Sequence, residues 1–269
     1  MYLAVDIGGT KTIVAAIEKN GHIHASQKFD TPKIYAQFLK LLEENIKTLD
    51  CKFESGVIAA PGKVDREKGI VIAFGNLDWK NIPLLDDIEP MVNCPIHIEN
   101  DTKLAGLSEA IYIKDEFSKV LYITISTGIN SALIVDGVIE EDLIDSESGD
   151  MLLEHDGKLQ KWESFASGKA IVKKYGKRAS EINNRSDWDA ISRNIALGII
   201  NLIAIIQPEV IVIGGGVGSH FKKFQAPLHD HLKKFEMPLV PIPPVRAAKK
   251  PEEAVIFGCY YLAKRYDAK

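Results

Sequence analysis

A glycine turn between two apolar runs opens the chain and limits what it can fold into. Residues 2–5 and 13–17 are apolar, and Asp6, Gly8 and Gly9 stand between them. This order predicts a strand, a tight turn and a second strand. The two glycines allow positive φ in the turn and, lacking a Cβ, allow a ligand to approach the backbone. We therefore expect the chain to begin with a β-hairpin.

The turn of this hairpin has the composition of a phosphate site. Backbone N–H groups at such a turn can hold a phosphate, and Thr10 and Lys11 add donors. Asp6, at the end of the first strand, could orient Mg²⁺ through its waters, because Mg²⁺ binds few protein carboxylates and keeps several waters. A plain hairpin with a surface acid remains the alternative, since short motifs also match by chance.

The same arrangement recurs in the middle of the chain. Residues 119–125 are mostly apolar and predict a strand, a small-residue turn with Thr127 and Gly128 follows, and residues 132–139 hold two more apolar runs around an Asp-Gly turn. The first hairpin is likewise followed by an alternating third strand at residues 22–29. The repeat predicts two similar halves, each starting with a hairpin. A cleft between two halves is the natural place for a ligand.

The rest of the chain mixes helical and extended patterns. Apolar spacing and turn residues predict helices over 33–50, 102–112, 163–174, 188–206, 220–234 and 252–265. Further strands are predicted over 57–60, 70–74, 95–98 and 210–213. Residues 143–161 are expected to form a loop, and residues 238–251 are rich in proline.

Composition narrows the class of protein. The 269 residues are 46% apolar and 26% charged, which suits one large or two medium soluble domains. A net charge of −4 with interspersed signs argues against a nucleic-acid partner.

Three widely spaced cysteines suggest neither a disulfide framework nor a zinc cluster. With no leader pattern, and an apolar run at 195–206 too short to span a bilayer, we expect a cytoplasmic protein away from the membrane. Whether the protein forms a homodimer is left open.

With these elements in place, the sequence resembles the ROK family of sugar kinases, named for repressors, open reading frames and kinases, over nearly its whole length. Residues 6–11 are similar to the first phosphate motif of the family, and residues 99–101 to its catalytic segment. The other similar segments, in chain order, are 61–62, 64–65 and 76–79 on the sugar side, the second phosphate motif at 126–129, the Glu-x-Gly-His segment at 147–150, the segment 163–168, and the adenosine motif at 213–216.

The resemblance implies a fold and a division into domains. The fold would be α/β, the two-domain actin-like ATPase (ribonuclease H-like) fold, with a mixed five-stranded sheet and flanking helices in each domain and the active site between them. Residues 1–104 would form the small domain, completed by a C-terminal helix at 250–269, and residues 105–249 the large one.

The resemblance also implies ATP-dependent, Mg²⁺-dependent phosphorylation of a hexose hydroxyl, with glucose as the expected hexose and glucose 6-phosphate as the product. Asp101 would be the general base; the alternative is that it only caps the helix that follows. The sugar would be bound by Asn76, Asn100, Asp101, Glu147, Asp150 and Glu163. The nucleotide would be bound by Asp6, Gly8, Gly9, Thr10, Lys11, Thr127, Gly128, Gly214, Gly215 and Gly216, with Asp6 also orienting Mg²⁺ through water. The alternatives are that Glu147 and Glu163 are ordinary surface acids, and that the three glycines form an ordinary strand-to-helix turn.

Two departures from the family pattern bear on activity. Ser126 and Asn130 stand where glycines are common and could narrow the phosphate site. The zinc module is missing: Asp150 replaces the histidine, and residues 156–161 replace the three-cysteine loop, so no structural zinc is expected. The runner-up function is therefore a sugar-sensing protein with little or no catalysis. The phosphoryl donor could be ATP, another nucleotide or polyphosphate. DNA-binding repression is disfavoured, because the chain begins in the first strand.

Overall fold

The structure, a computed structural model, describes residues 1–267. By its internal contacts the chain divides into unit 1, made of residues 1–108 and the segment that starts at Glu253, and unit 2, residues 109–252. The predicted domain limits, and the predicted cleft, stay predictions.

Unit 1 is built on a five-stranded sheet in the order β3-β2-β1-β4-β8. The strands β1, β2 and β3 form an antiparallel meander, while β4 and β8 run parallel to β1. The elements are β1 (Tyr2–Ile7), β2 (Lys11–Ile17), β3 (Ile23–Asp30), α1 (Tyr35–Thr48), β4 (Ser55–Ala60), β5 (Gly62–Asp65), β6 (Ile70–Phe74), β7 (Lys80–Ile82), α2 (Leu84–Val92), β8 (Ile96–Asn100) and α9 (Ala254–Asp267), with α3 (Asp101–Ile111) leading into unit 2.

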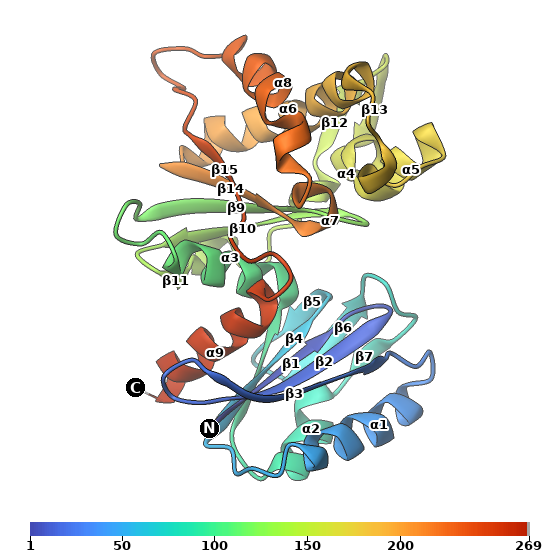
Figure 1. Cartoon of the computed structure of the whole chain (residues 1–269), viewed down its shortest axis with the longest axis vertical. Helices are drawn as coiled ribbons and strands as arrows, with labels where there is room; N and C mark the ends of the chain where they lie inside the picture. The colour runs from blue at the N-terminus through green and yellow to red at the C-terminus, as the bar shows by residue number, and fades with distance from the viewer. Residues whose placement is uncertain (268–269) are drawn as a thin grey trace. The chain divides into compact units, whose positions relative to one another are not determined.

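Helices cover both faces of this sheet (Figure 1). Alternate residues of β1, such as Leu3 and Val5, share a buried cluster with Phe38 and Leu42 of α1. On the other face α9 packs on β1 and β4. Because side chains alternate along a strand, a strand covered on both faces is apolar throughout, which is why residues 2–5 carry no polar side chain other than the Tyr2 hydroxyl.

A smaller sheet, β5-β6-β7, and helix α2 were not expected from the sequence. Pro90 lies inside α2, and a proline is unfavourable in a helix interior. The helix nevertheless forms, because Leu84 and Ile88 are fully buried in the unit 1 core and Asp86 and Asp87 stand in its first turn, where negative charge is favourable.

Unit 2 repeats the strand arrangement of unit 1, with the order β11-β10-β9-β14-β15. Here β9, β10 and β11 form the antiparallel meander, and β14 and β15 run parallel to β9. The elements are β9 (Lys119–Ile125), β10 (Ile129–Val135), β11 (Val138–Ile139), the 3₁₀ turns η1 (Glu141–Leu143) and η2 (Ser148–Asp150), β12 (Leu152–His155), β13 (Lys158–Lys161), α4 (Trp162–Ala166), α5 (Gly168–Tyr175), the 3₁₀ turn η3 (Ala179–Glu181), α6 (Arg185–Ile206), β14 (Val210–Gly214), α7 (Gly215–Gly218), α8 (Phe221–Lys233) and β15 (Val245–Ala247).

Helix α6 is the central helix of the unit 2 core. Its Ile195 and Ile199 are fully buried and share a cluster with Ile123 of β9 and Phe224 of α8, and α6 and α8 run together over the sheet in Figure 1. Within residues 1–267, α6 alone is long and apolar enough to cross a membrane by length and composition. Its burial in the protein is typical of a core helix.

The prediction of two mixed five-stranded sheets, each starting with a hairpin, is confirmed. Two local predictions are wrong. Residues 143–161 are not a loop, because they contain the hairpin β12–β13. The single helix expected at 163–174 is broken at Ser167, whose backbone is extended and whose hydroxyl accepts a hydrogen bond from the Ala170 N–H as the N-cap of α5.

Candidate active site

Three parallel strands of unit 1 bring predicted site residues to one edge of the sheet. Asp6 of β1 pairs with Ala59 of β4, and Ala60 of β4 pairs with Asn100 of β8. Asp101 follows directly as the first residue of α3. The carboxyl ends of parallel strands are where α/β sheets place their ligands. Asp6, Asn100 and Asp101 therefore lie at one edge, as a joint site requires.

The predicted phosphate turn between β1 and β2 is tight, and its glycines are needed for space. The Gly8 N–H donates to the Lys11 carbonyl at 2.9 Å. A Cβ on Gly8 would lie 2.6 Å from that carbonyl oxygen, and a Cβ on Gly9 would lie 2.5 Å from the Asn76 Cβ. Neither glycine has positive φ, so that expectation is wrong. The close approach of Gly9 to Asn76 brings the phosphate turn beside a predicted sugar residue.

Threonines hold this turn in place. The Thr31 hydroxyl donates to the Gly8 carbonyl at 2.7 Å and shares a 2.9 Å hydrogen bond with the buried Thr12 hydroxyl. Thr10 and Lys11 are exposed, and the Lys11 ammonium forms an ion pair with Asp30. Binding of a phosphate by Lys11 would therefore compete with this exposed pair, which is a small cost.

Asn100, and not Asp101 alone, caps helix α3. Its Oδ1 accepts from the N–H groups of Thr102 at 2.9 Å and Lys103 at 3.3 Å, and its Nδ2 donates to the Gly62 carbonyl at 2.9 Å. Asp101 contributes one oxygen: its Oδ1 accepts from the Thr102 N–H at 2.7 Å. Within residues 1–267, Asp101 Oδ2 makes no hydrogen bond. One carboxylate oxygen of Asp101 is thus available for a substrate.

Burial raises the pKa values of both acids at this edge. The pKa of Asp101 is raised to about 6 by burial, against the lowering effect of hydrogen bonds from Thr102. The pKa of Asp6 is raised to about 7 by burial and by the negative charge of Asp101, while Lys28 lowers it. A carboxyl with a pKa near neutral pH is suited to take up a proton during a reaction.

Unit 2 presents two further turns at the carboxyl ends of neighbouring parallel strands. The turn with Thr127 and Gly128 follows β9, and Gly215 and Gly216 follow β14. Gly215 has a φ of +79° and lies against Thr124, where a Cβ would be 2.6 Å from the Thr124 hydroxyl oxygen. A Cβ on Gly216 would meet no atom within 4 Å. Only the last glycine therefore borders open space.

These two turns face a cavity of about 810 Å³. Thr127 and Gly216 line it, whereas Gly128, Gly214 and Gly215 belong to the same turns without lining it. Apolar contacts come from Val172, Ala179 and Val217. The other residues that line it are Ser126, Gly168, Lys169, Lys173, Arg178, Ser180 and His220.

The basic side chains of this cavity were missed from the sequence. Lys169 and Lys173 are one turn apart on α5 and so lie on one helix face, and Arg178 precedes η3. No acidic side chain is among the residues that line the cavity. The arrangement suits a ligand with a flat apolar part and several negative charges. The spacing of the two lysines after Ser167-Gly168 was the signal available in the sequence, but these lysines belong to none of the motifs.

The three predicted sugar acids of unit 2 lie around the start of β10. The Asn130 side chain donates to Glu147 Oε2 at 2.9 Å, and the Ile129 N–H donates to Glu163 Oε2 at 3.4 Å. Asp150 forms an exposed ion pair with Lys161 at 2.8 Å. None of these acids is among the residues that line the large cavity. They therefore form a separate cluster beside the same turn.

Packing holds the segment where a zinc loop would be expected. Trp162 is fully buried, and its indole N–H donates to the Asn194 carbonyl of α6 at 3.1 Å. The His155 ring stacks on Phe165 with a centroid separation of 4.1 Å, and the Asn194 amide donates to the Phe165 carbonyl at 3.1 Å. Trp162 and Phe165 anchor this segment to the core. Within residues 1–267 there is no cluster of three metal-ligating side chains.

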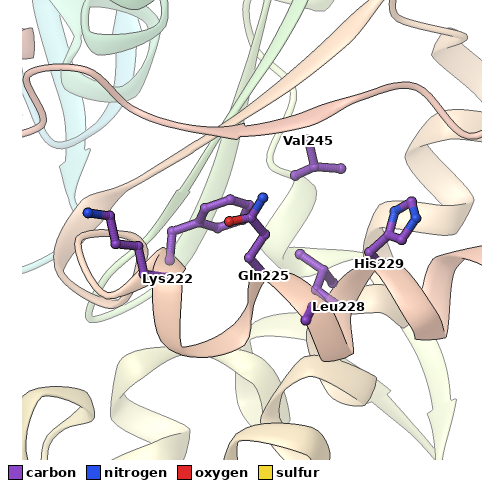
Figure 2. Close-up of a pocket in the computed structure, with 7 residues that line it drawn as sticks. Lys222, Gln225, Leu228, His229 and Val245 are labelled. Carbon is purple, nitrogen blue, oxygen red and sulfur yellow. The ribbon is translucent and has the colours of Figure 1, made fainter.

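A second cavity, of about 360 Å³, lies between α8 and β15 in unit 2 (Figure 2). Lys222, Gln225 and His229 stand along α8 with exposed polar ends, and Val245 lies opposite. The residues that line it include none of the predicted site residues. The larger cavity is therefore the candidate ligand site of unit 2.

Comparison with known proteins identifies the family. A family model described as "ROK family" matches residues 2–266, which is nearly the whole chain. The chain belongs to the ROK family. The predicted family is therefore confirmed.

Relatives in the ROK family are similar along the whole chain but distant. Glucokinase of Streptomyces coelicolor is 23% identical, and the match covers 98% of each chain. N-acetyl-D-glucosamine kinase of Escherichia coli is 25% identical, with 97% of this chain and 99% of the relative covered. The solved structure of a ROK family glucokinase from Streptomyces griseus, in complex with glucose and AMPPNP, aligns with a TM-score of 0.83 at 23% identity and covers 98% of this chain and 99% of its own. The predicted actin-like ATPase fold is confirmed, and these relatives support the prediction of a sugar kinase.

Proposed function

We propose that this ROK family protein is a sugar kinase that transfers the γ-phosphoryl group of ATP to a hexose hydroxyl. Relatives named as glucokinase and as N-acetyl-D-glucosamine kinase support the sugar class and leave the hexose open. Glucose, giving glucose 6-phosphate, is our first candidate. We place the protein in the cytoplasm, with a sugar and a nucleotide as its partners.

The large cavity of unit 2 is the observation that carries the proposal. The predicted second phosphate turn and the predicted adenosine turn both line it, through Thr127 and Gly216. Val172, Ala179 and Val217 offer an apolar surface for a base, and lysine and arginine side chains offer charge for phosphates. A nucleoside triphosphate has this combination of parts. The structure with AMPPNP named above supports ATP as the donor.

On the acceptor side, Asp101 would act as the general base. The sugar hydroxyl oxygen forms a bond to the γ-phosphorus, the bond from that phosphorus to the bridging oxygen breaks, and ADP leaves with the electron pair. The hydroxyl proton passes to Asp101, whose Oδ2 has no hydrogen bond within residues 1–267. Positioning and charge neutralisation supply most of the catalysis in such a reaction.

Asp6 fits the role of orienting Mg²⁺ through water. Its carboxylate makes no hydrogen bond in the described part of the chain, and its pKa is raised by burial and by the nearby negative charge of Asp101. When bound with the nucleotide, Mg²⁺ would neutralise charge on the transferred phosphoryl group. Asp6 would hold the hydrated ion beside the Gly8-Gly9 turn.

Sugar hydroxyls would be bound by side chains that offer hydrogen-bond acceptors and donors. Ionised Glu147 and Glu163 can each accept hydroxyl protons, and the Asn76 amide can both donate and accept. Asn100 uses most of its amide within the protein, so its contact with a sugar would use the one remaining Nδ2 N–H. Asp150 would have to leave Lys161 to reach a sugar.

A panel of sugars assayed with several phosphoryl donors tests the proposal. Glucose, mannose, fructose and the N-acetylated hexosamines would be combined with ATP, other nucleotides and polyphosphate, and sugar phosphate would be measured directly. We expect turnover with at least one hexose and ATP. Sugar binding by calorimetry without turnover would instead establish the sugar-sensing alternative.

Gly216→Trp is expected to block the donor site without unfolding the protein. Because a Cβ at Gly216 meets no atom within 4 Å and its φ is not positive, a side chain is accommodated there and enters the cavity. We expect KM for the donor to rise by more than about tenfold while KM for the sugar is little changed. Gly216→Ala is the control and should behave as the wild type. An unchanged donor KM in the tryptophan variant would contradict the assignment of this cavity.

The activity should depend on magnesium, and the purified protein should contain no bound zinc. Since the β12–β13 segment is held by Trp162 and Phe165, we expect no stoichiometric zinc in the purified protein. Activity should be lost with excess chelator and return on addition of Mg²⁺, because the phosphoryl charge must be neutralised. Elemental analysis, with activity before and after chelation, provides the check. One zinc per chain, or activity that persists in chelator, would contradict this interpretation.

A further inference from the structure

The first two residues of β10 donate hydrogen bonds to the carboxylates of two glutamates that we propose bind the sugar. Ile129 binds Glu163 through its backbone N–H, and Asn130 binds Glu147 through its side-chain amide, with N···O distances of 3.4 and 2.9 Å. The backbone of Asn130 is fixed because this residue pairs with Thr124 of β9 in the sheet. The carboxylates of two different segments thus depend on neighbouring positions of one strand.

The orientation of the Asn130 amide is determined by both of its partners. Its Oδ1 accepts from the Ser131 N–H at 2.7 Å, and its Nδ2 donates to Glu147 Oε2 at 2.9 Å. A backbone N–H can only donate, and a carboxylate can only accept. Turning the amide over would break both contacts. Asn130 therefore presents an N–H to Glu147 in a single defined orientation.

Close packing fixes the surroundings of this contact. A Cβ on Gly149 would overlap the Ile129 carbonyl and would lie 3.3 Å from Glu163 Oε2. A Cβ on Gly128 would lie 2.7 Å from the same oxygen. The segments that carry Glu147 and Glu163 are therefore packed against the start of β10, although the hydrogen bond between Asn130 and Glu147 is itself exposed.

Asp150 contrasts with Glu147. Its carboxylate pairs with the Lys161 ammonium at 2.8 Å, and both side chains are about half exposed, at 53% and 54%. Asp150 is thus paired with a surface lysine, whereas Glu147, although also exposed, is oriented by a strand residue. Of these two acids, Glu147 is the better placed to bind a sugar hydroxyl in a fixed geometry.

We infer that Asn130 is a positioning residue for the acceptor sugar, acting through its hydrogen bond to Glu147. The inference rests on the proposed function. It assigns the asparagine to the sugar side, although the sequence places it in the second phosphate motif, where a narrower phosphate site was expected. The donor cavity is lined by Ser126 and Thr127 from this turn but not by Asn130, which agrees with that assignment.

The test separates the two substrates kinetically. Asn130→Ala removes the amide, and Asn130→Asp places a second carboxylate against Glu147. In both variants KM for the sugar should rise by roughly tenfold, the effect of losing one hydrogen bond to a charged group, while KM for the donor stays within about twofold of the wild type. Asn201→Ala, an exposed asparagine of α6, is the matched control and should leave both constants unchanged. The melting temperature should be the same in all variants.

A double-mutant cycle shows whether Asn130 acts through Glu147. Glu147→Ala should itself raise KM for the sugar, and adding Asn130→Ala to it should cause no further rise, because the partner of the Asn130 amide is already lost. An increase in the donor KM, or an unchanged sugar KM in an active Asn130→Ala protein, would overturn the inference alone. A wild-type protein that phosphorylates no sugar with any donor would overturn the proposed function and this inference with it.

Discussion

Asp101→Asn is expected to lower the rate of sugar phosphorylation by roughly 10²–10⁴-fold. An amide has nearly the shape of the carboxylate and can still accept the Thr102 N–H, but it cannot take up the hydroxyl proton. Helix α3 should stay intact because Asn100 supplies two further capping contacts. Steady-state kinetics, with sugar binding measured by calorimetry, provides the check. Wild-type turnover in the variant would show that Asp101 only caps the helix.

The same substitution should stabilise the fold above about pH 6. The folded-state pKa of Asp101 is raised from 3.8 to about 6, so folding favours the protonated acid. The stability that this preference contributes is present in full below the pKa of the unfolded state, and it is lost as the pH rises through the pKa of the folded state. Asp101→Asn escapes the loss, which is at most about 3 kcal/mol. Denaturation without Mg²⁺ or nucleotide should show a gain over wild type at pH 8 that disappears near pH 4. Equal stability at pH 8 would contradict the raised pKa.

Trp162→Ala is expected to cost about 3–5 kcal/mol of the free energy of unfolding of unit 2. The indole is fully buried, and its N–H donates to the Asn194 carbonyl between α4 and α6, so its removal leaves a large cavity and breaks this hydrogen bond. Urea unfolding followed by tryptophan fluorescence measures the loss, with Trp79 of unit 1 replaced by phenylalanine in both proteins so that the signal comes from unit 2. Because a chain of two units need not unfold in one step, the unit 2 signal is the relevant one.

Leu239→Ala provides the control for this measurement. Leu239 is 85% exposed, so the substitution should change the free energy of unfolding by less than about 0.5 kcal/mol. If Trp162→Ala cost no more than the control, the segment that follows β13 would have another anchor, and the zinc interpretation would need to be reopened.

Local patterns were enough to predict most of the sheet framework. The hairpins follow from glycine and apolar runs that are contiguous in sequence, and β6 and β9 have the bounds expected. The hairpin β12–β13 was missed because it is short and polar, and it is held by packing of Trp162 and Phe165 on α6, which is distant in sequence. Helix α2 was missed because Pro90 argues locally against it, while burial of Ile88 favours it.

The candidate site was predictable only where motifs are short and continuous. Asp6 was predicted from its position at the end of the first strand, and Asp101 from the resemblance of residues 99–101 to the catalytic segment of the family; the fold places both at one edge. The basic wall of the large cavity was missed, because Lys169 and Arg178 belong to segments that meet the Thr127 turn only in the folded chain. Local sequence also gave no sign that Asn130 contacts Glu147, a contact that spans 17 residues.

Direct detection of the phosphorylated sugar tests the central claim most directly. The wild-type protein would be incubated with each hexose and Mg-ATP, with Asp101→Asn in parallel, and products would be followed by phosphorus NMR. We predict that the wild type forms ADP and a hexose phosphate in equal amounts from at least one sugar, and that Asp101→Asn binds that sugar but forms neither product at a comparable rate. ADP without sugar phosphate, or equal rates for the two proteins, would contradict the account.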